Sequence, residues 1–324
     1  MPFGRKEPRT RIFFATDVHG SDQCFRKWLN AARVYDAQVL ILGGDVTGKI
    51  IVPLVANGDG VWRGEIYDEP VQAREGEELE ALQKRIRTIG RYDVLLTAQE
   101  KAEVDAHPHG LDALFHRAMR ESLERWVALA EERLAGSRVP CFMMLGNDDY
   151  EDLGELLRGS ETVTNAEDDI VELPGGFEMA SFGYSTPTPW DSPRELPEEE
   201  MAARIDALVA RLRDPEHAVF NFHCPPHGTH LDQAPMLDAE LRPQVDATGL
   251  KVGPVGSTAV RAAIEQSGPL LGLHGHVHES PAAQKVGRTL CVNPGSEYSD
   301  GILRGAIVDL DRAKGVRRWQ IVQG

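Results

Sequence analysis

The sequence predicts an α/β fold with a ligand site at one edge of its sheet. The chain opens with an apolar strand, an amphipathic helix and a second apolar strand, expected at residues 11–16, 22–34 and 38–42. The two strands run directly into DVHG and GGDVTG, which are polar and glycine-rich. Open α/β sheets bind ligands at this place, outside the carboxyl ends of their strands.

A long segment separates this opening from the next apolar strand, which is expected at residues 139–145. The gap of roughly 90 residues is far longer than an ordinary connection, so it must have structure of its own. The elements that we predict in it are a hairpin, at residues 50–55 and 61–67 around Asn57-Gly58-Asp59-Gly60, and two helices, at 72–89 and 111–134. We therefore expect a hairpin and helical cap over residues 50–137, inserted in a single domain over residues 1–324.

A second run of strands is predicted after Asp149. The expected strands are at 169–173, 177–184, 218–222, 270–273, 289–292, 304–310 and 316–322, with an acidic helix at 198–213. Connections between the last strands are short, which is typical of an antiparallel sheet.

The composition excludes several classes of protein. The formal net charge of −16 argues against broad affinity for nucleic acid or for an anionic membrane, since either would require a basic face. No apolar stretch is long enough to span a bilayer, and the first ten residues do not resemble a signal peptide. The cysteines, Cys24, Cys141, Cys224 and Cys291, show no paired spacing. A cytoplasmic location is the expectation that fits best.

Polar clusters follow the apolar strands in five places. They are Asp17-Val-His19, Gly44-Asp45, Gly146-Asn147-Asp148-Asp149, His223 with the following CPPHGTHLD, and Gly275-His276-Val277-His278. Each one alone has a structural explanation, such as a helix cap, a turn or a packed histidine. Five such explanations at five strand ends are much less convincing than one shared metal site. Mixed imidazole, carboxylate and amide ligands suit Mn, Fe, Zn, Co or Ni rather than Ca or Mg alone.

The order D-x-H, G-D, G-N-D-D, H-x-P-P, G-H-x-H resembles the calcineurin-like metallophosphoesterases. The segments HCPPHGTHLD and VNPGS are most similar to their Icc-related bacterial and archaeal branch. The resemblance implies a four-layer α-β-β-α sandwich with two mixed β-sheets. It also implies two divalent metal ions, for which we expect Mn first, and hydrolysis of a phosphate ester by a hydroxide that bridges them. The expected substrate is a small molecule or a nucleotide. The long insertion has no counterpart in the resemblance.

Carried over to this sequence, the resemblance assigns a role to each polar cluster. Asp17, His19 and His278 would hold the first metal; Asn147, His223 and His276 would hold the second. Asp45 would bridge the two ions, and Asn147 would also contact the phosphoryl oxygens. The turn Asn293-Pro-Gly-Ser296 would support the ligands from behind.

One departure leaves the general acid open. Many members of the family have Gly-Asn-His, whereas this chain has Asp148 after Asn147. An aspartate at its ordinary pKa is ionised at pH 7, so either Asp148 has a raised pKa or His227 replaces it as acid and substrate contact. Because a strong general acid is missing, we expect phosphodiesters or activated monoesters as substrates rather than unactivated monoesters. Trp190 is a further candidate for substrate contact, as a stacking surface at the entrance.

Two other functions remain as alternatives. The departure at Asp148 would also suit a catalytically weak scaffold that binds a protein partner through the helical insertion. A redox di-iron protein also uses His and carboxylate ligands, but such sites are usually built on facing helices of a bundle rather than at strand ends.

Overall fold

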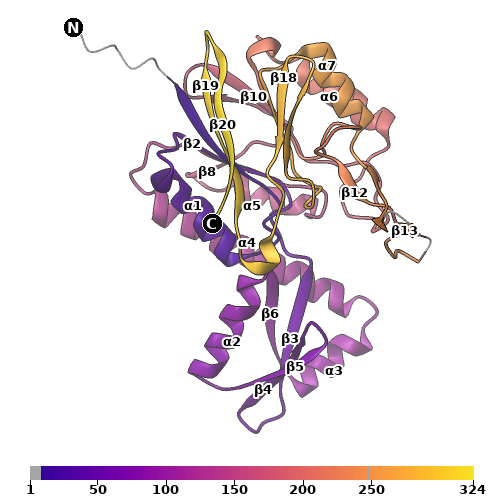
Figure 1. The fold of residues 1–324 in the computed structure, drawn as a ribbon. Coiled ribbons are helices and arrows are strands. Elements are labelled where there is room, and N and C mark those ends of the chain that lie inside the picture. The colour runs from indigo at the N-terminus through magenta and orange to yellow at the C-terminus, as the bar shows by residue number, and fades with distance from the viewer. Residues whose placement is uncertain (1–8, 239, 247–248) are drawn as a thin grey trace.

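Two six-stranded sheets lie face to face in the computed structural model, which describes residues 9–238, 240–246 and 249–324 (Figure 1). The first sheet has the order β20 (Gly315–Gln323), β19 (Arg304–Asp311), β1 (Thr10–Ala15), β2 (Val39–Gly43), β7 (Cys141–Met144), β8 (Val163–Asn165). The second has the order β17 (Ala282–Val286), β18 (Thr289–Asn293), β16 (Leu271–Leu273), β11 (Val219–Phe222), β10 (Phe177–Phe182), β9 (Ile170–Leu173).

Both sheets are mixed, as predicted. In the first, β1, β2, β7 and β8 are parallel, while β19 pairs antiparallel with β1, and β20 pairs antiparallel with β19 at the edge. In the second, β10, β11, β16 and β18 are parallel, with β9 and β17 antiparallel at the two edges. Apolar side chains such as Phe14, Ile41, Met179 and Leu271 fill the space between the sheets. This arrangement brings the carboxyl ends of the parallel strands of both sheets to one region.

Helices cover the outer face of each sheet, which confirms the four-layer sandwich. On the first sheet lie α1 (Asp22–Val34), α4 (Gly110–Leu134) and α5 (Gly154–Arg158); on the second lie α6 (Glu198–Val209) and α7 (Thr258–Ser267). The helix α1 begins where the Ser21 side chain accepts a hydrogen bond from the amide of Cys24. Phe25 of α1 stacks on Trp126 of α4 with ring centroids 4.2 Å apart, which joins the two helices in one layer.

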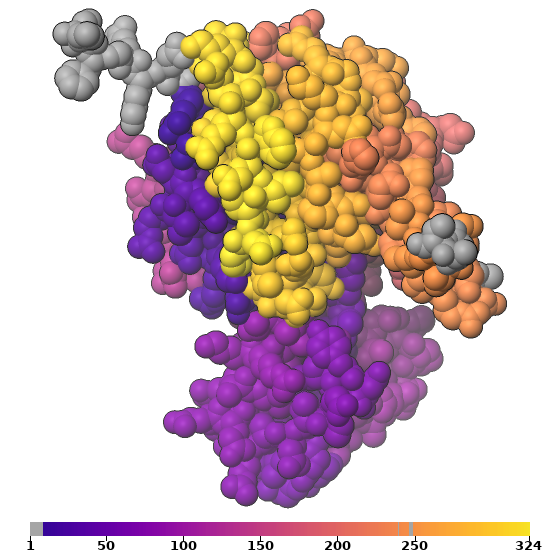
Figure 2. Space-filling model, viewed as in Figure 1, coloured from indigo at the N-terminus to yellow at the C-terminus, as the bar shows by residue number. Residues whose placement is uncertain are grey.

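The segment between β2 and β7 contains a second, smaller sheet that protrudes from the sandwich as a separate lobe (Figures 1 and 2). Its strands have the order β5 (Glu69–Arg74), β4 (Val61–Ile66), β3 (Ile50–Ala56), β6 (Arg91–Thr97). The helices of the lobe are α2 (Glu77–Thr88) and α3 (Ala98–Ala106). Val52, Leu54, Ile66, Leu82 and Ile86 form a small core of its own.

The predicted hairpin is present as β3 and β4, but one prediction for the insertion was wrong in detail. The helix expected at 72–89 begins only at Glu77, because residues 69–74 pair with β4 as an edge strand. The helix α4, which lies within the segment 50–137, packs on α1, α5 and β8 of the sandwich and also on α3, β3 and β6 of the lobe, so it joins the two parts.

The base of the lobe is fastened to the loops that follow β1 and β2. The amide of Gly48 donates to the Tyr92 hydroxyl at 2.6 Å, and the Ser21 hydroxyl donates to the Thr88 carbonyl at 2.7 Å. The hairpin tip between β3 and β4 points away from the sandwich (Figure 1).

Short elements complete the described chain. They are the 3-10 turns Glu151–Leu153, Pro215–His217 and Tyr298–Asp300, and the strands β12 (Gln233–Pro235), β13 (Val245–Asp246), β14 (Gly249–Leu250) and β15 (Val252–Pro254). Within the described ranges, no helix combines the length and the apolar character needed to cross a membrane.

Candidate metal centre

The polar clusters predicted from the sequence meet at the carboxyl ends of the parallel strands. Asp17 and His19 follow β1, Asp45 follows β2, Asn147 follows β7, His223 follows β11, and His276 and His278 follow β16. They come from both sheets and span most of the chain.

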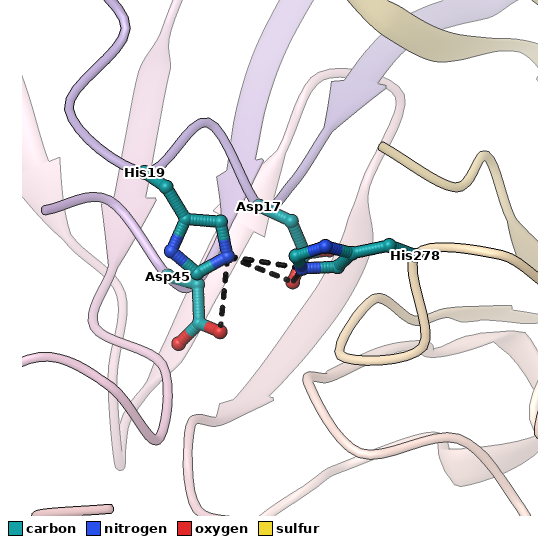
Figure 3. A group of neighbouring side chains, drawn as sticks. All are labelled: Asp17, His19, Asp45 and His278. Carbon is teal, nitrogen blue, oxygen red and sulfur yellow. Dashed lines mark hydrogen bonds and ion pairs between the residues drawn. The ribbon is translucent and has the colours of Figure 1, made fainter. Parts of the chain in front are cut away.

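Two groups of side chains that could each hold a metal ion meet at Asp45. The first contains Asp17, His19, Asp45 and His278, and the second contains Asp45, His223 and His276. Within each group the ligand atoms lie within 4.8 Å of one another. In the first, the Nε2 atoms of His19 and His278 are 3.0 Å apart, and Asp45 Oδ2 lies 3.6 Å from His19 Nε2 (Figure 3). Because Asp45 belongs to both groups, the two sites share a carboxylate.

The amide of Asn147 lies beside the second group. Its Oδ1 is 2.7 Å from His276 Nδ1, and its Nδ2 donates to the Ser192 hydroxyl at 2.9 Å and to Asp148 at 3.1 Å. The two bonds from Nδ2 orient the amide so that its oxygen faces the histidine. All seven side chains expected to ligate metal are therefore brought together.

The environment of His223 fits a metal ion. Its Nδ1–H donates to the Gly43 carbonyl at 2.8 Å, which leaves Nε2 as the free ligand atom. Nε2 is buried and has no hydrogen-bond partner among the described residues, and it lies 3.3 Å from Asp45 Oδ2. A buried polar atom without a partner is costly, and a metal ion at this point removes that cost. A histidine oriented through its other ring nitrogen is typical of metal sites.

Charges in the centre are arranged to attract cations. Burial alone would raise the pKa of Asp45, but the neighbouring His223, His19 and Lys49 hold it well below its usual range. Burial lowers the pKa of His276 to about 4 and that of His19 far below its usual value, so both rings are neutral at pH 7. Burial also opposes the charging of His223, yet the carboxylates of Asp45 and Asp17 raise its pKa to about 9. A proton on His223 thus competes with a metal ion for Nε2.

Four residues of these two groups have a left-handed backbone. The φ angles are 53° at Asp17, 38° at His19, 49° at Asp45 and 66° at His276. This region is unfavourable for residues other than glycine and is found most often at functional sites, where the surrounding structure enforces it. Here the amide of Asp17 donates to Gly44 O at 3.1 Å and that of His19 to Asp45 O at 3.0 Å, which ties the two loops together.

Glycines make room for the carboxylates. A Cβ at Gly146 would lie 2.1 Å from Asp45 Oδ1, and one at Gly275 would lie 2.4 Å from Asp17 Oδ2. The glycines of the G-N and G-H motifs are therefore required by the close approach of two loops.

Further side chains hold the loops from behind. The buried Asp149 carboxylate accepts hydrogen bonds from the amides of Val46, Thr47 and Gly146, so it joins the loops after β2 and β7. Ser296 donates to the Asp17 carbonyl at 2.6 Å, and Asn293 donates to the Val277 carbonyl at 2.9 Å. The turn 293–296 thus contacts the ligand loops, in keeping with the supporting place predicted for it.

The polar residue that follows Asn147 is paired with a lysine that the sequence analysis did not single out. Asp148 forms an ion pair with Lys49, and its amide donates to Asp45 Oδ1 at 3.0 Å. Burial and the charge of Asp45 raise the pKa of Asp148 to about 7, although Lys49 opposes this shift. This raised pKa meets the condition stated above for Asp148 as the general acid, and its role in proton transfer stays a prediction.

A cavity of ≈ 870 Å³ opens from the centre to solvent. Asp45, Lys49, Asn147, His276 and His278 line its floor, together with Asp148 and Tyr298. Lys49 and Tyr298 were missed from the sequence. Their positions in the sequence could have indicated them. Lys49 lies four residues after Asp45, and Tyr298 lies two residues after the turn that ends at Ser296.

The three residues predicted to contact substrate have different positions. Asn147 lies on the cavity floor and Trp190 on its wall, with 69% of its surface exposed. His227 is absent from the described cavity lining, and its Nδ1 donates instead to Gly256 O at 3.2 Å. The geometry therefore gives no support to His227 as an acid. The described part of the segment 50–137 contributes no residue to the lining.

Comparisons with known proteins agree on the fold. A crystal structure with 17% sequence identity superposes with a TM-score of 0.59, covering 98% of this chain and 99% of the other. TT1561 of Thermus thermophilus, with 14% identity, gives a TM-score of 0.54 over 97% of this chain and 99% of the other. Uncharacterized protein MJ1162 of Methanocaldococcus jannaschii is 31% identical over 120 residues, which are 36% of this chain and about half (48%) of that protein. No family model matches the chain.

Proposed function

We propose that this chain is a calcineurin-like metallophosphoesterase, as the resemblance of its motifs implies, and that it hydrolyses phosphate esters with the help of two divalent metal ions. The observation that carries the proposal is the place of Asp45 in two buried groups of ligands at once. A carboxylate shared between two such groups is the arrangement that holds a pair of metal ions close together.

The ligands divide between the two ions according to the two groups. Asp17, His19 and His278 would hold the first ion, and His223, His276 and the Asn147 amide oxygen the second, with Asp45 between them. The pair would supply Lewis acidity to the phosphoryl oxygens and lower the pKa of water. Manganese is our first choice, since this mixture of nitrogen and oxygen ligands suits it, with Fe, Zn, Co and Ni as the other candidates.

The chain supplies orientation and charge around this pair. Hydrolysis adds water across a P–O bond, so the leaving oxygen gains negative charge until it takes up a proton. Among the described residues that line the cavity, Lys49 is the one Lys or Arg side chain, and Asp148 holds it at the floor. We propose that Lys49 stabilises charge on the phosphoryl group or on the leaving oxygen. One cation suits the single charge of a phosphodiester, which we propose as the substrate class.

Reconstitution with metal tests the proposal. Protein stripped of metal should be inactive, and Mn²⁺ should restore hydrolysis of bis(p-nitrophenyl) phosphate in preference to p-nitrophenyl phosphate. Metal analysis of the active protein should give two ions per chain. A protein that holds two ions and hydrolyses neither these nor other esters in a broad panel would contradict the proposal, and would favour a binding scaffold.

Replacing Lys49 should slow the reaction without removing metal. We expect Lys49→Met to lower kcat/KM for the diester about 10- to 100-fold, because a charge-assisted contact to the reacting group is lost. Lys49→Arg should keep more of the activity. The control is Lys101→Met, whose lysine pairs with Asp105 on the lobe helix α3. Metal content equal to that of the parent, measured on each variant, separates this role from ligand support; an unchanged kcat/KM in Lys49→Met would refute it.

A further inference from the structure

The walls of the cavity above the metal centre differ in character from its floor. One wall is the loop 186–190, which contributes Pro187, Pro189 and Trp190. A second part of the wall comes from the segment around β12 and contributes Met236, Leu237 and Leu241. These side chains are apolar, although the wall lies at the surface.

The apolar side chains on these walls are exposed. Trp190 is 69% exposed, Leu241 48% and Met236 42%. Large apolar side chains that gather at one cavity mark a binding surface, because a soluble protein otherwise has little reason to leave them together in water. The volume of ≈ 870 Å³ is sufficient for an organic group in addition to a phosphoryl group.

The wall that carries Trp190 is held in place and is connected to the metal centre. Glu195 accepts hydrogen bonds from the Thr188 and Ser192 amides at 2.9 Å each, and from their hydroxyls at 2.6 and 2.5 Å. Ser192 in turn accepts the bond from Asn147. The wall is therefore preformed. The loop that carries Trp190 is also hydrogen-bonded directly, through Ser192, to the proposed metal ligand Asn147.

The charges around the cavity disfavour a polyanion. Besides Lys49, the charged Lys, Arg, Asp and Glu side chains in the described lining are the carboxylates Asp45, Asp148, Asp238 and Glu279. Asp45 belongs to the metal centre, and Asp148 already pairs with Lys49. A second phosphate beyond the floor would thus meet carboxylates and apolar walls instead of Lys or Arg. Nucleic acids and nucleoside polyphosphates need such cations along their backbone.

We infer that the cavity walls form a subsite for a bulky apolar ester group, so that the substrate is a phosphodiester with one phosphoryl group and a hydrophobic organic substituent. This inference rests on the proposed function. The phosphoryl group lies at the floor, and the apolar group packs between Trp190 and Met236. Transfer of such a group out of water supplies binding energy that a small substituent lacks.

A series of diesters with one leaving group tests the subsite. In methyl, phenyl and naphthyl p-nitrophenyl phosphate, only the group that stays on phosphorus changes. With the Mn²⁺-loaded protein, we expect kcat/KM to rise from methyl to naphthyl by about 10- to 100-fold. Trp190→Ala should lower the naphthyl-to-methyl ratio about tenfold, and Met236→Gln should lower it in the same direction.

The chain offers a matched control in Trp319, which is 44% exposed on β20 and is not among the residues that line the cavity. Trp319→Ala should keep the parent ratio. Equal turnover of the three esters would overturn the subsite and leave the proposed function intact, whereas no turnover of any ester with two ions bound would contradict the function itself. A short oligothymidylate that inhibits the reaction as strongly as naphthyl phosphate does would show that the cavity does not exclude nucleic acid.

Discussion

Asp45→Asn should abolish hydrolysis, with a loss of about 10³-fold or more in kcat/KM for the diester. The substitution keeps the size of the side chain but removes its charge. It also replaces one oxygen by an amide nitrogen, which cannot bind a cation. Asp45 Oδ2 lies 3.3 Å from His223 Nε2 and 3.6 Å from His19 Nε2, so both groups of ligands lose their common member. Metal analysis should show fewer than two ions per chain.

The matched control is Asp309→Asn. Asp309 is also buried and charged, but it pairs with Arg11 at the opposite end of β1, far from the ligand loops. Its replacement should leave kcat/KM within about twofold of the parent, since no ligand is touched. Turnover in Asp45→Asn within tenfold of the parent, with two ions still bound, would refute the shared-carboxylate site.

Asp149→Ala should cost about 3–5 kcal/mol of folding free energy, a large part of the total for a domain. The carboxylate is fully buried and accepts from the amides of Val46, Thr47 and Gly146 at 3.0, 2.8 and 2.7 Å. Alanine would leave these buried donors without partners. Urea unfolding of the metal-free protein measures the loss, and poorer metal binding should accompany it, because the same bonds position the loops that carry Asp45 and Asn147.

The neighbouring residue provides the control for this experiment. Asp148 keeps 17% of its side chain exposed and pairs with Lys49. Asp148→Ala should therefore change the free energy of unfolding by about 1 kcal/mol or less. If both alanine variants lose the same stability, the buried carboxylate of Asp149 does not have the structural role described for it.

The sandwich and its ligands were predictable because both depend on local signals. A strand buried on both faces is a short apolar run, as in VLILG of β2, and the polar residue after it lies at the carboxyl end of the sheet. Asp17, Asp45 and His223 each follow such a strand. Their convergence then follows from parallel pairing within each sheet and from the packing of the two sheets.

Other parts of the molecule gave weaker signals. The strand β5, EPVQAR, is a charged edge strand, and its residues also match helical spacing, so a helix was predicted through it. The walls of the cavity come from short strands and loops around residues 186–190 and 233–255, which have no periodic pattern. The structural role of Asp149 depends on contacts with Val46 and Thr47, which lie 103 and 102 residues earlier in the chain. No local sequence pattern predicts such contacts.

The distribution of the ligands over both sheets also sets the order of events during folding. Asp17 and Asp45 belong to the first sheet, while His223, His276 and His278 belong to the second. During synthesis, the early ligands leave the ribosome long before His278, and the complete centre forms only once the two sheets have docked. On the proposed function, metal loading would thus be a late step, and the bound ions would stabilise the docked arrangement of the two sheets.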